Sequence, residues 1–484
     1  MAVEEELIHT ALTAACNTPQ TYQQARDSPH WIDWEAAISA ELANMAKYDV
    51  WEIAPEGNHR ALPGKWVFTR KIDGETGKPA KFKARFVVKG FRQIKGKDYN
   101  EVFASIAHKD LIRVLFSIVN YLGMPCHQVD IKGAFLNGDI DHKIYIEPPE
   151  GMPIPAGMLL KLKRSLYRLK QSPYLFNKAL DAWPKEQGLI PTKADPCIYI
   201  RRRGKSLLLI SIHVDDQLIA CNSQEELDTF KKLLNVRFEC SDRGPVNYFL
   251  GINIFRDIPA KLLYLSQEHY LESLLERFGM TTCHPSTTIF PSDFKPTPPT
   301  DEEFEAARHL DFPSMAGGIL YAASITRPDL AFAAGLLCRF ISKWNKSIYK
   351  AAKHVLRYIR GTSDLCLTYD GSGSQRVMLG YADADWGGCL NTRRSTTGYV
   401  FQIYGATVAW KSRRQASTAL STTHAELLAT TDAARQVQWL RQLLDDLGMG
   451  MAKDIPISLY NDNSGAVLLA QHPHNHKMMK HYDI

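Results

Sequence analysis

Apolar residues recur at helical spacing in the first half of the chain and predict three helices there. They are expected over 29–47, 110–122 and 224–238, and the last opens with Ser223 and Glu226 in the pattern of a capping box. The apolar stripe of the first helix comprises Trp31, Trp34, Ile38, Leu42 and Met45. These helices are separated by segments with a different pattern.

Runs of apolar and β-branched residues between the helices predict strands. A hairpin rich in basic residues is expected first, with its tip at 73–78. Further strands are expected over 125–131, 207–220, 248–255 and 262–265. The segment 125–131 carries Asp130 near its end, and 207–220 reads as two strands joined by a tight turn at Asp215–Asp216. Helices that alternate with hairpins indicate an α+β fold with an antiparallel sheet.

The second half of the chain is divided by two changes in composition. Residues 291–313 hold five prolines and six acidic residues, which is typical of an extended linker. Residues 315–361 follow with a mostly helical pattern, and a Gly/Ser stretch over 370–375 marks the second boundary. From 377 onward, strands precede helices and another strand, so we expect a separate mixed α/β unit there.

The net charge of +6 becomes informative once it is located. Between Arg60 and Lys97, twelve cationic residues face only two acidic ones, and a second basic run over 161–178 has six cations and no acid. A charge run is usually a solvated surface. Here aromatic and β-branched residues interleave with the cations, which favours a surface that binds a polyanion such as nucleic acid or a triphosphate.

Several classes of protein are disfavoured by the sequence. No uninterrupted apolar run reaches the roughly 18–20 residues that a membrane span needs, and the acidic start is unlike a signal peptide. We therefore expect an intracellular protein, cytoplasmic or nuclear, with no membrane contact. The nine cysteines are scattered and never spaced as C-x-x-C, which argues against a disulfide scaffold and a zinc finger.

Three carboxylates carry the strongest chemical signal. Two adjacent carboxylates in a turn between buried strands, Asp215 and Asp216, repel each other and contribute nothing to packing, although an acidic pair is common in turns. Asp130, near the end of another apolar strand, tips the balance toward function. Nucleotide polymerisation uses two Mg²⁺ ions about 3.5–4 Å apart, and carboxylates from separate strands can hold them.

The motifs around these carboxylates resemble the reverse transcriptase of copia-type LTR retrotransposons. In chain order they are KWVFTRK, KARFVVKGFRQ, VDIKGAFLNG, IYIEPPEG, LYRLKQSP, VDD, FLGI, TRPD and LRYIRGT. The resemblance implies a right-hand polymerase with fingers, palm and thumb, a connection region and a ribonuclease H-like domain. The implied divisions are 1–50 for an N-terminal helical extension, 51–290 for the reverse transcriptase, 291–370 for linker and connection, and 376–484 for the ribonuclease H-like domain.

The resemblance also implies roles for residues of the polymerase. Asp130 and Asp215 would be direct metal ligands, and Asp216 a more tolerant third carboxylate. Phe135 would be the aromatic gate against a ribose 2′-OH, unless it is an ordinary core residue. Gln171 would line the incoming nucleotide. The cations Lys83 and Arg85 would hold its triphosphate.

The C-terminal unit resembles the ribonuclease H domain that follows the polymerase in this family. Asp383, Glu426, Asp462 and Asp483 would bind two Mg²⁺ ions there, with Asp383 preferred over Asp385 for the first position. Because family members continue into a closing helix, the domain is expected to be cut short soon after Asp483.

Three residues depart from the family's usual pattern, and one group of histidines needs its own interpretation. His213 stands where the family usually has tyrosine, Arg168 where it has glycine, and His424 where it commonly has glutamate. A further group of histidines near the C-terminus lacks any accompanying cysteine, which favours phosphate contact or turn formation over a zinc site. It comprises His472, His474, His476 and His481.

The implied function is RNA- and DNA-directed DNA synthesis with cleavage of RNA in hybrids. The implied partners are RNA template, DNA primer, RNA/DNA hybrid, dNTPs and other polyprotein products of the retrotransposon, with Mg²⁺ (or Mn²⁺) as cofactor. Three alternatives stay open: an inactive retroelement remnant, a nucleic-acid-binding module without catalysis, and a ribonuclease H alone.

Overall fold

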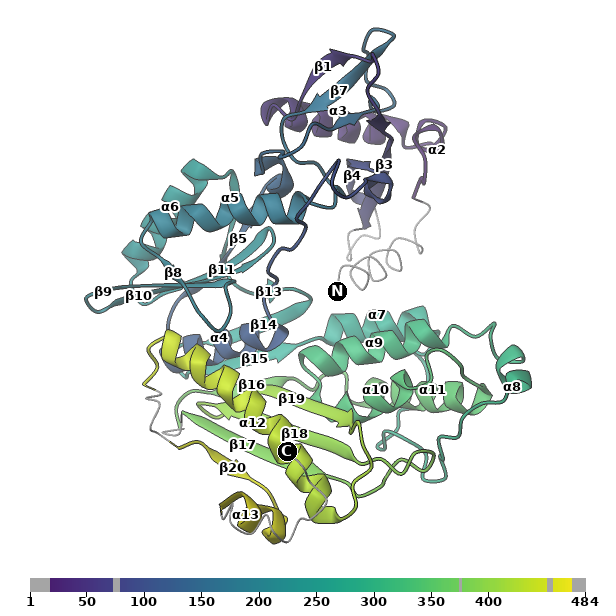
Figure 1. Cartoon of the computed structure of the whole chain (residues 1–484), viewed down its shortest axis with the longest axis vertical. Coiled ribbons are helices and arrows are strands. Elements are labelled where there is room, and N and C mark those ends of the chain that lie inside the picture. Colours follow the sequence, from purple (N-terminus) through teal and green to yellow (C-terminus); the bar gives the residue numbers. More distant parts are fainter. Residues whose placement is uncertain (1–17, 73–78, 374–376, 451–455, 472–484) are drawn as a thin grey trace.

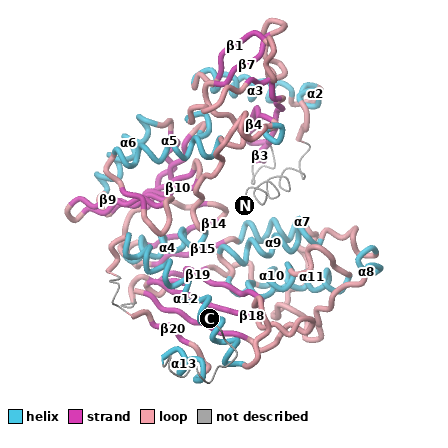
Figure 2. The backbone as a smooth tube through the Cα atoms, viewed as in Figure 1, coloured by secondary structure: helices cyan, strands magenta, loops and turns pink. Residues whose placement is uncertain are grey.

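The structure is a computed structural model that describes residues 18–72, 79–373, 377–450 and 456–471. Figure 1 shows an elongated molecule in which N-terminal elements at the top lead to a central sheet, and helices and a C-terminal sheet lie below it. Figure 2 shows helices and strands mixed along the whole length, as the α+β pattern predicts. None of the helices in these ranges is long and apolar enough to cross a membrane.

The N-terminal part packs helices on two small sheets. Its helices are α2 (Tyr22–Arg26) and α3 (Trp31–Lys47), and its four-stranded sheet has the order β1 (Trp51–Pro55), β7 (Met158–Leu162), β6 (Tyr145–Ile146), β2 (Ala61–Leu62). The basic segment forms a hairpin of β3 (Gly64–Ile72) and β4 (Pro79–Val88). Trp34 of α3 packs edge-on against Phe68 and Phe82, so α3 covers the apolar face of this hairpin.

A six-stranded sheet forms the centre of the molecule. Its strands are, in spatial order, β12 (Cys240–Pro245), β5 (Cys126–Ile131), β11 (Asp216–Cys221), β10 (Ser206–His213), β9 (Ile198–Arg203) and β8 (Ile190–Pro191). One face is covered by α5 (Ser172–Glu186) and α6 (Gln224–Arg237), and the other by α4 (Lys109–Tyr121). A short 3₁₀ helix, η2 (Ala134–Asn137), follows β5.

Helices dominate the segment after the central sheet. A second sheet runs β13 (Tyr248–Phe249), β14 (Ile252–Asp257), β15 (Leu262–Ser266), β16 (Leu367–Asp370). Between its last two strands the chain forms a helical cluster with its own apolar core. The helices are α7 (Glu268–Arg277), α8 (Asp301–Glu305), α9 (Phe312–Ile325), α10 (Ala331–Cys338) and α11 (Lys346–Gly361).

The C-terminal part is a mixed sheet covered by a long helix. The sheet has the order β19 (Ala406–Arg414), β18 (Thr396–Ile403), β17 (Met378–Ala384), β20 (Ser458–Tyr460), and β20 is parallel to β17. The helix α12 (Thr422–Asp446) crosses it, and α13 (Ser464–Gln471) follows β20. This is the mixed α/β pattern expected from 377 onward.

Helix α4 joins the central sheet to the C-terminal sheet through a buried polar stripe. Arg113 donates to the carbonyl of Val408 at 2.7 Å, stacks 3.9 Å above the ring of Trp410 and pairs with Asp110. Ser117 donates to the carbonyl of Ile403 at 2.7 Å. Because buried polar groups are costly unless they are hydrogen-bonded, these bonds fix the seating of α4 on the C-terminal sheet.

Several expected elements shift by one residue at an end, and three differ from the expectation in other ways. The first helix begins at Trp31 rather than at residue 29, with His30 at its N-cap. The strand expected over 248–255 is two strands, β13 and β14, because Leu250 and Gly251 turn the chain with positive φ. The acidic, proline-rich linker contains the short helix α8, which begins with a capping box at Thr300.

Candidate active sites

The structure brings the first three predicted carboxylates to one end of the central sheet. Asp130 of β5 and Asp216 of β11 are directly paired across the two antiparallel strands. Asp215 lies in the two-residue turn between β10 and β11, and its carbonyl accepts from the amide of Ile131 at 2.9 Å. The turn places Val214 at a φ of 56°, a conformation that costs a β-branched residue about 1–3 kcal/mol. The turn places Asp215 at the tip of the hairpin formed by β10 and β11.

The three carboxylates concentrate negative charge, and two arginines partly balance it. Burial raises the pKa of Asp215, and the charges of Asp216 and Asp130 raise it further, whereas Arg85 lowers it. Arg243 lies 3.6 Å from a carboxylate oxygen of Asp130. Among the described residues, no three ligand atoms of this group lie within 4.8 Å of one another. The negative charge of the three carboxylates therefore suits a divalent cation, but their oxygens do not converge on one point.

Lys83 and Arg85 lie next to this centre on β4, two residues apart and therefore on the same side of the strand. Arg85 lies over the ring of Tyr167, with its guanidinium carbon 5.7 Å from the ring centre. Desolvation and the charge of Arg85 lower the pKa of Lys83, and Glu41 and Asp130 act in the opposite direction. The charge of Asp130 therefore reaches Lys83.

Phe135 projects from η2, one turn beyond β5. Its ring makes edge contacts with Tyr167 and Phe176, at 6.0 Å and 6.2 Å between ring centres. Gly133 begins this turn with a φ of 57°. Phe135 is half-buried, so the structure is compatible with both the gate and the core interpretation.

Gln171 is completely buried, and both ends of its amide are engaged within the chain. Its oxygen accepts from Gln93 at 2.9 Å, and its nitrogen donates to the carbonyl of Asp98 at 2.8 Å. Because the side chain is completely buried, a nucleotide could bond to this amide only if the surrounding residues moved. Nearby, Arg168 adopts a φ of 67°, the left-handed region that favours glycine, and its carbonyl abuts Gly90. The backbone thus explains why glycine suits position 168.

A second group of carboxylates converges on the C-terminal sheet. Asp383 near the end of β17, Glu426 on α12 and Asp462 just beyond β20 have ligand oxygens within 4.8 Å of one another. The parallel pairing of Tyr381 with Tyr460 aligns the two strands so that the aspartates lie side by side. Within the described ranges this is the one cluster of three or more groups able to hold a metal ion.

The backbone and one asparagine orient Glu426 within this cluster. The amide of Ala384 donates to one carboxylate oxygen at 3.1 Å, and the side chain of Asn461 donates to the other at 2.8 Å. Burial raises the pKa of Glu426, and the charges of Asp383 and Asp462 add to it, against the lowering effect of those two bonds. Three converging oxygen donors with this repulsion fit a hard divalent cation.

The structure separates Asp385 from the cluster and assigns it another environment. Its carboxylate accepts from the amides of Thr396 at 2.8 Å and Gly388 at 3.2 Å, which stabilises the loop after β17. The ring of His424 accepts from the amide of Leu420 at 3.1 Å, at the start of α12. Asp483 and the C-terminal histidines His472, His474, His476 and His481 lie outside the described residues.

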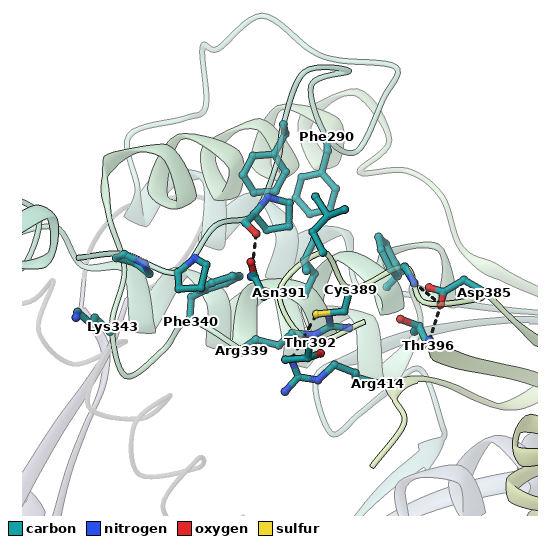
Figure 3. Close-up of a pocket in the computed structure, with 18 of the residues that line it drawn as sticks. Phe290, Arg339, Phe340, Lys343, Asp385, Cys389, Asn391, Thr392, Thr396 and Arg414 are labelled. Carbon is teal, nitrogen blue, oxygen red and sulfur yellow. Dashed lines mark hydrogen bonds between the residues drawn. The ribbon is translucent and has the colours of Figure 1, made fainter. Parts of the chain in front are cut away.

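Asp385 faces a cavity of about 680 Å³ between the proline-rich segment, α10 and the C-terminal sheet (Figure 3). Phe290 and Phe340 contribute apolar surface to its lining, and Cys389 and Arg414 contribute polar groups. The guanidinium of Arg414 donates to the Cys389 sulfur at 3.6 Å. Burial raises the pKa of Cys389, but hydrogen bonds, including those from Thr392 and Arg414, bring it down to about 7. The cavity adjoins the second cluster without containing its carboxylates.

Sequence reasoning missed three residues that act on these sites. The charge of Glu41 acts on the pKa of Lys83, Arg243 pairs with Asp130, and Asn461 orients Glu426. Asn461 precedes Asp462 in the motif YNDN and could have been found there. Glu41 interrupts the apolar stripe of α3, which was a weaker signal.

Comparison with known proteins matches residues 48–291, half of the chain, to the family described as reverse transcriptase (RNA-dependent DNA polymerase). A Pol polyprotein from transposon TNT 1-94 of Nicotiana tabacum is 35% identical over 475 residues, which cover 96% of this chain and 35% of that protein. A Pol polyprotein from transposon RE1 of Arabidopsis thaliana is 31% identical over 480 residues, covering 97% and 32%. The chain thus spans about a third of the length of these relatives.

Proposed function

The chain belongs to the reverse transcriptase (RNA-dependent DNA polymerase) family and is homologous to copia-type retrotransposon Pol polyproteins, and we propose that it extends a DNA primer on an RNA or DNA template. The observation that carries the proposal is the grouping of Asp130, Asp215 and Asp216 at one sheet end, beside the cations of β4. Carboxylates next to cations suit the joint binding of metal ions and a triphosphate.

In this proposal the elements divide as in a right-hand polymerase. The β3–β4 hairpin and α3 act as fingers, the central sheet as palm, and the β13–β14 hairpin and helical cluster as primer grip, thumb and connection. Residues 376–484 act as a ribonuclease H-like domain. Hybrid recognition would rest on backbone shape and 2′-OH contacts, and the basic hairpin would make binding strongly salt-dependent.

The residues of the first centre would divide the work of nucleotide addition. Asp130 and Asp215 would hold divalent metal ions, which activate the primer 3′-OH and stabilise the leaving pyrophosphate. Lys83 and Arg85 would hold the triphosphate so that its α-phosphorus lies in line with the attacking oxygen. Phe135 would exclude a 2′-OH, and Gln171 would shape the nucleotide site through the loop that it fixes.

A second activity, cleavage of RNA in a hybrid, is favoured by the convergence of Asp383, Glu426 and Asp462. Bound metal ions would activate water and stabilise the leaving 3′ oxygen. Asn461 and the amide of Ala384 hold Glu426 in place for this role. Asp483 would be the fourth carboxylate.

Primer extension on poly(rA) with oligo(dT), dTTP and Mg²⁺ tests the polymerase. Wild-type chain should incorporate dTMP, and Asp215→Asn should lose incorporation while it still binds the hybrid. Asp228→Asn, a substitution of a half-buried aspartate on α6, is the matched control and should stay active. Absence of Asp215-dependent incorporation with retained binding would instead identify an inactive remnant or a nucleic-acid-binding module.

A further inference from the structure

The cavity of Figure 3 lies where three parts of the chain meet. These parts are the proline-rich segment before α8, helix α10 with the turn after it, and the C-terminal sheet with the loop after β17. Its volume of about 680 Å³ falls within the roughly 300–1,000 Å³ of small-molecule sites. Most of its lining is apolar and comes from Phe290, Phe294, Pro296, Pro298, Pro299, Phe332, Leu336, Phe340 and Leu390. The cavity is therefore large enough for a small organic ligand with an apolar body.

Contacts between the lining residues fix the cavity without a ligand. Asn391, in the loop after β17, donates through Nδ2 to the carbonyl of Pro296 at 3.1 Å, so the loop and the proline-rich segment are joined (Figure 3). The rings of Phe290 and Phe294 contact each other, with their centres 5.1 Å apart. A ligand that enters a lining already held in place has less conformational entropy to remove, which favours binding.

The charges of the lining are predominantly positive. Arg339, Lys343 and Arg414 line the cavity together with a single carboxylate, that of Asp385. Lys343 pairs with Asp301 outside the lining at 2.6 Å, and the carboxylate of Asp385 already accepts from two backbone amides. Within the ranges that the structure describes, no ion pair joins Arg339 or Arg414 to a carboxylate. The cavity therefore offers two guanidiniums to an anion.

The two guanidiniums share one acceptor, the sulfur of Cys389. Arg414 donates to this sulfur at 3.6 Å, and Arg339 also hydrogen-bonds to it. Burial lowers the pKa of Arg339, and the charge of Arg414 lowers it further, because the two like charges repel each other. A phosphate or carboxylate group accepts from guanidinium groups more strongly than a thiol does. An anionic group at this end of the cavity would therefore relieve the repulsion.

We propose that this cavity binds a small aromatic anion, whose ring packs against the phenylalanines and whose phosphate, sulfonate or carboxylate group accepts from Arg339 and Arg414. Offset and edge-to-face contacts between rings stabilise such packing beyond the burial of apolar area. The bound ligand joins the proline-rich segment to the C-terminal sheet. The inference does not depend on the proposed polymerase or nuclease function, because no carboxylate of either centre lines the cavity.

Binding of anilinonaphthalene sulfonate to the full chain tests the proposal. This dye is an aromatic sulfonate whose fluorescence reports binding to apolar surface. We expect Kd to rise about tenfold in Arg414→Met, which removes one charge-assisted hydrogen bond to the sulfonate. Arg413→Met is the matched control, because Arg413 is the neighbouring residue of β19, pairs with Asp432 and does not line the cavity. Equal affinity in Arg414→Met and Arg413→Met would overturn the proposal.

Alkylation of Cys389 gives a second readout that needs no substitution. Cys389 is buried and lines the cavity, so iodoacetamide must enter the cavity to reach its sulfur. With dye at ten times Kd, about nine-tenths of the sites are occupied, and alkylation of the Cys389 peptide, followed by mass spectrometry, should slow about tenfold. Cys366 is half-buried outside the lining and should keep its rate. Unchanged alkylation of Cys389 would show that the dye binds elsewhere and would overturn the proposal.

Competition against the dye distinguishes the sources of such a ligand. AMP and naphthoate each join an aromatic ring to an anionic group, whereas adenosine lacks the charge and inorganic phosphate lacks the ring. Displacement by AMP identifies a nucleotide as the ligand, and displacement by naphthoate alone identifies an aromatic carboxylate. Displacement by adenosine as strong as that by AMP would exclude a role for the guanidiniums, and displacement by neither anion would limit the site to the dye. Either of these last two results contradicts the proposal.

Discussion

The two carboxylate centres differ in whether cationic side chains balance their negative charge. At the first centre, Arg243 pairs with Asp130, and Arg85 lowers the pKa of Asp215, while the ligand oxygens stay apart. At the second centre, the three oxygens converge within 4.8 Å, and no ion pair to any of the three carboxylates occurs in the part of the chain that the structure describes.

The backbone conformations at the two centres also differ. Asp215 lies on a tight turn that strains Val214, and the neighbouring loop strains Arg168. Asp383 and Glu426 lie on a regular strand and helix. We therefore expect the first centre to bind a ligand that brings both metal and negative charge, as a metal-bound nucleotide does. We expect the second to bind a cation before any substrate arrives.

The largest expected effect separates the two activities completely. Glu426→Gln removes a charge from the convergent cluster and should lower hydrolysis of labelled RNA in an RNA/DNA hybrid by at least about a hundredfold, which corresponds to roughly 3 kcal/mol of barrier. Primer extension should stay within about twofold of wild type. Asp215→Asn should show the reverse pattern. Hydrolysis that survives Glu426→Gln would remove the nuclease role from this cluster.

Metal binding without nucleic acid should distinguish the centres next. Folding raises the pKa of Glu426 above its ordinary 4.5, so the native state binds the extra proton, and the stability due to this group falls as pH rises above 4.5. Mg²⁺ should restore that stability by about 1–3 kcal/mol at saturating concentration, measured as a shift in Tm. Asp383→Asn should lose the shift, and Asp130→Asn should keep it. An equal loss in both variants would contradict a preformed second centre.

Motifs placed the carboxylates on elements of the expected kind because strand ends and turns are encoded locally. Asp130 and Asp383 lie on expected strands and Glu426 on an expected helix. The turn expected at Asp215–Asp216 comprises Val214 and Asp215, and Asp216 begins β11. The pattern could not give the partners of these groups, since Arg243 on β12 meets Asp130 only after the sheet assembles. Burial of Gln171 is a tertiary outcome of the same kind.

The junction between the central and C-terminal sheets also escaped the sequence pattern. Arg113, Ser117 and Asn120 are polar residues that recur at helical spacing on α4. The structure buries them, and their hydrogen bonds end on carbonyls of strands far along the chain, such as Tyr369 for Asn120. Amphipathic spacing reports which residues share a face, but it does not report what covers that face.

A smaller effect tests the strain at the first centre. Arg168→Gly relieves a left-handed residue and should raise the free energy of unfolding by about 1 kcal/mol, measured by urea denaturation. Because Tyr167 precedes this residue and Gln171 follows three positions later, KM for dNTP should change while RNA hydrolysis does not. A matched change at an exposed residue with ordinary backbone, Lys170→Gly, should destabilise instead. Stabilisation by both variants would show that strain at 168 is not the cause.

The smallest expected effect concerns the counter-charge at the first centre. Arg243 lies 3.6 Å from Asp130 with its side chain 54% exposed, so the pair contributes about 0.2–1 kcal/mol. A metal ion that binds Asp130 must displace this attraction. Arg243→Met should therefore lower the Mg²⁺ concentration for half-maximal primer extension by about twofold to fivefold and leave that for RNA hydrolysis unchanged. Arg237→Met, a basic residue at the end of α6, should alter neither. A higher Mg²⁺ requirement in Arg243→Met would mean that Arg243 orients Asp130 for the metal rather than competing with it, and the contrast between the two centres would then lie in their geometry alone.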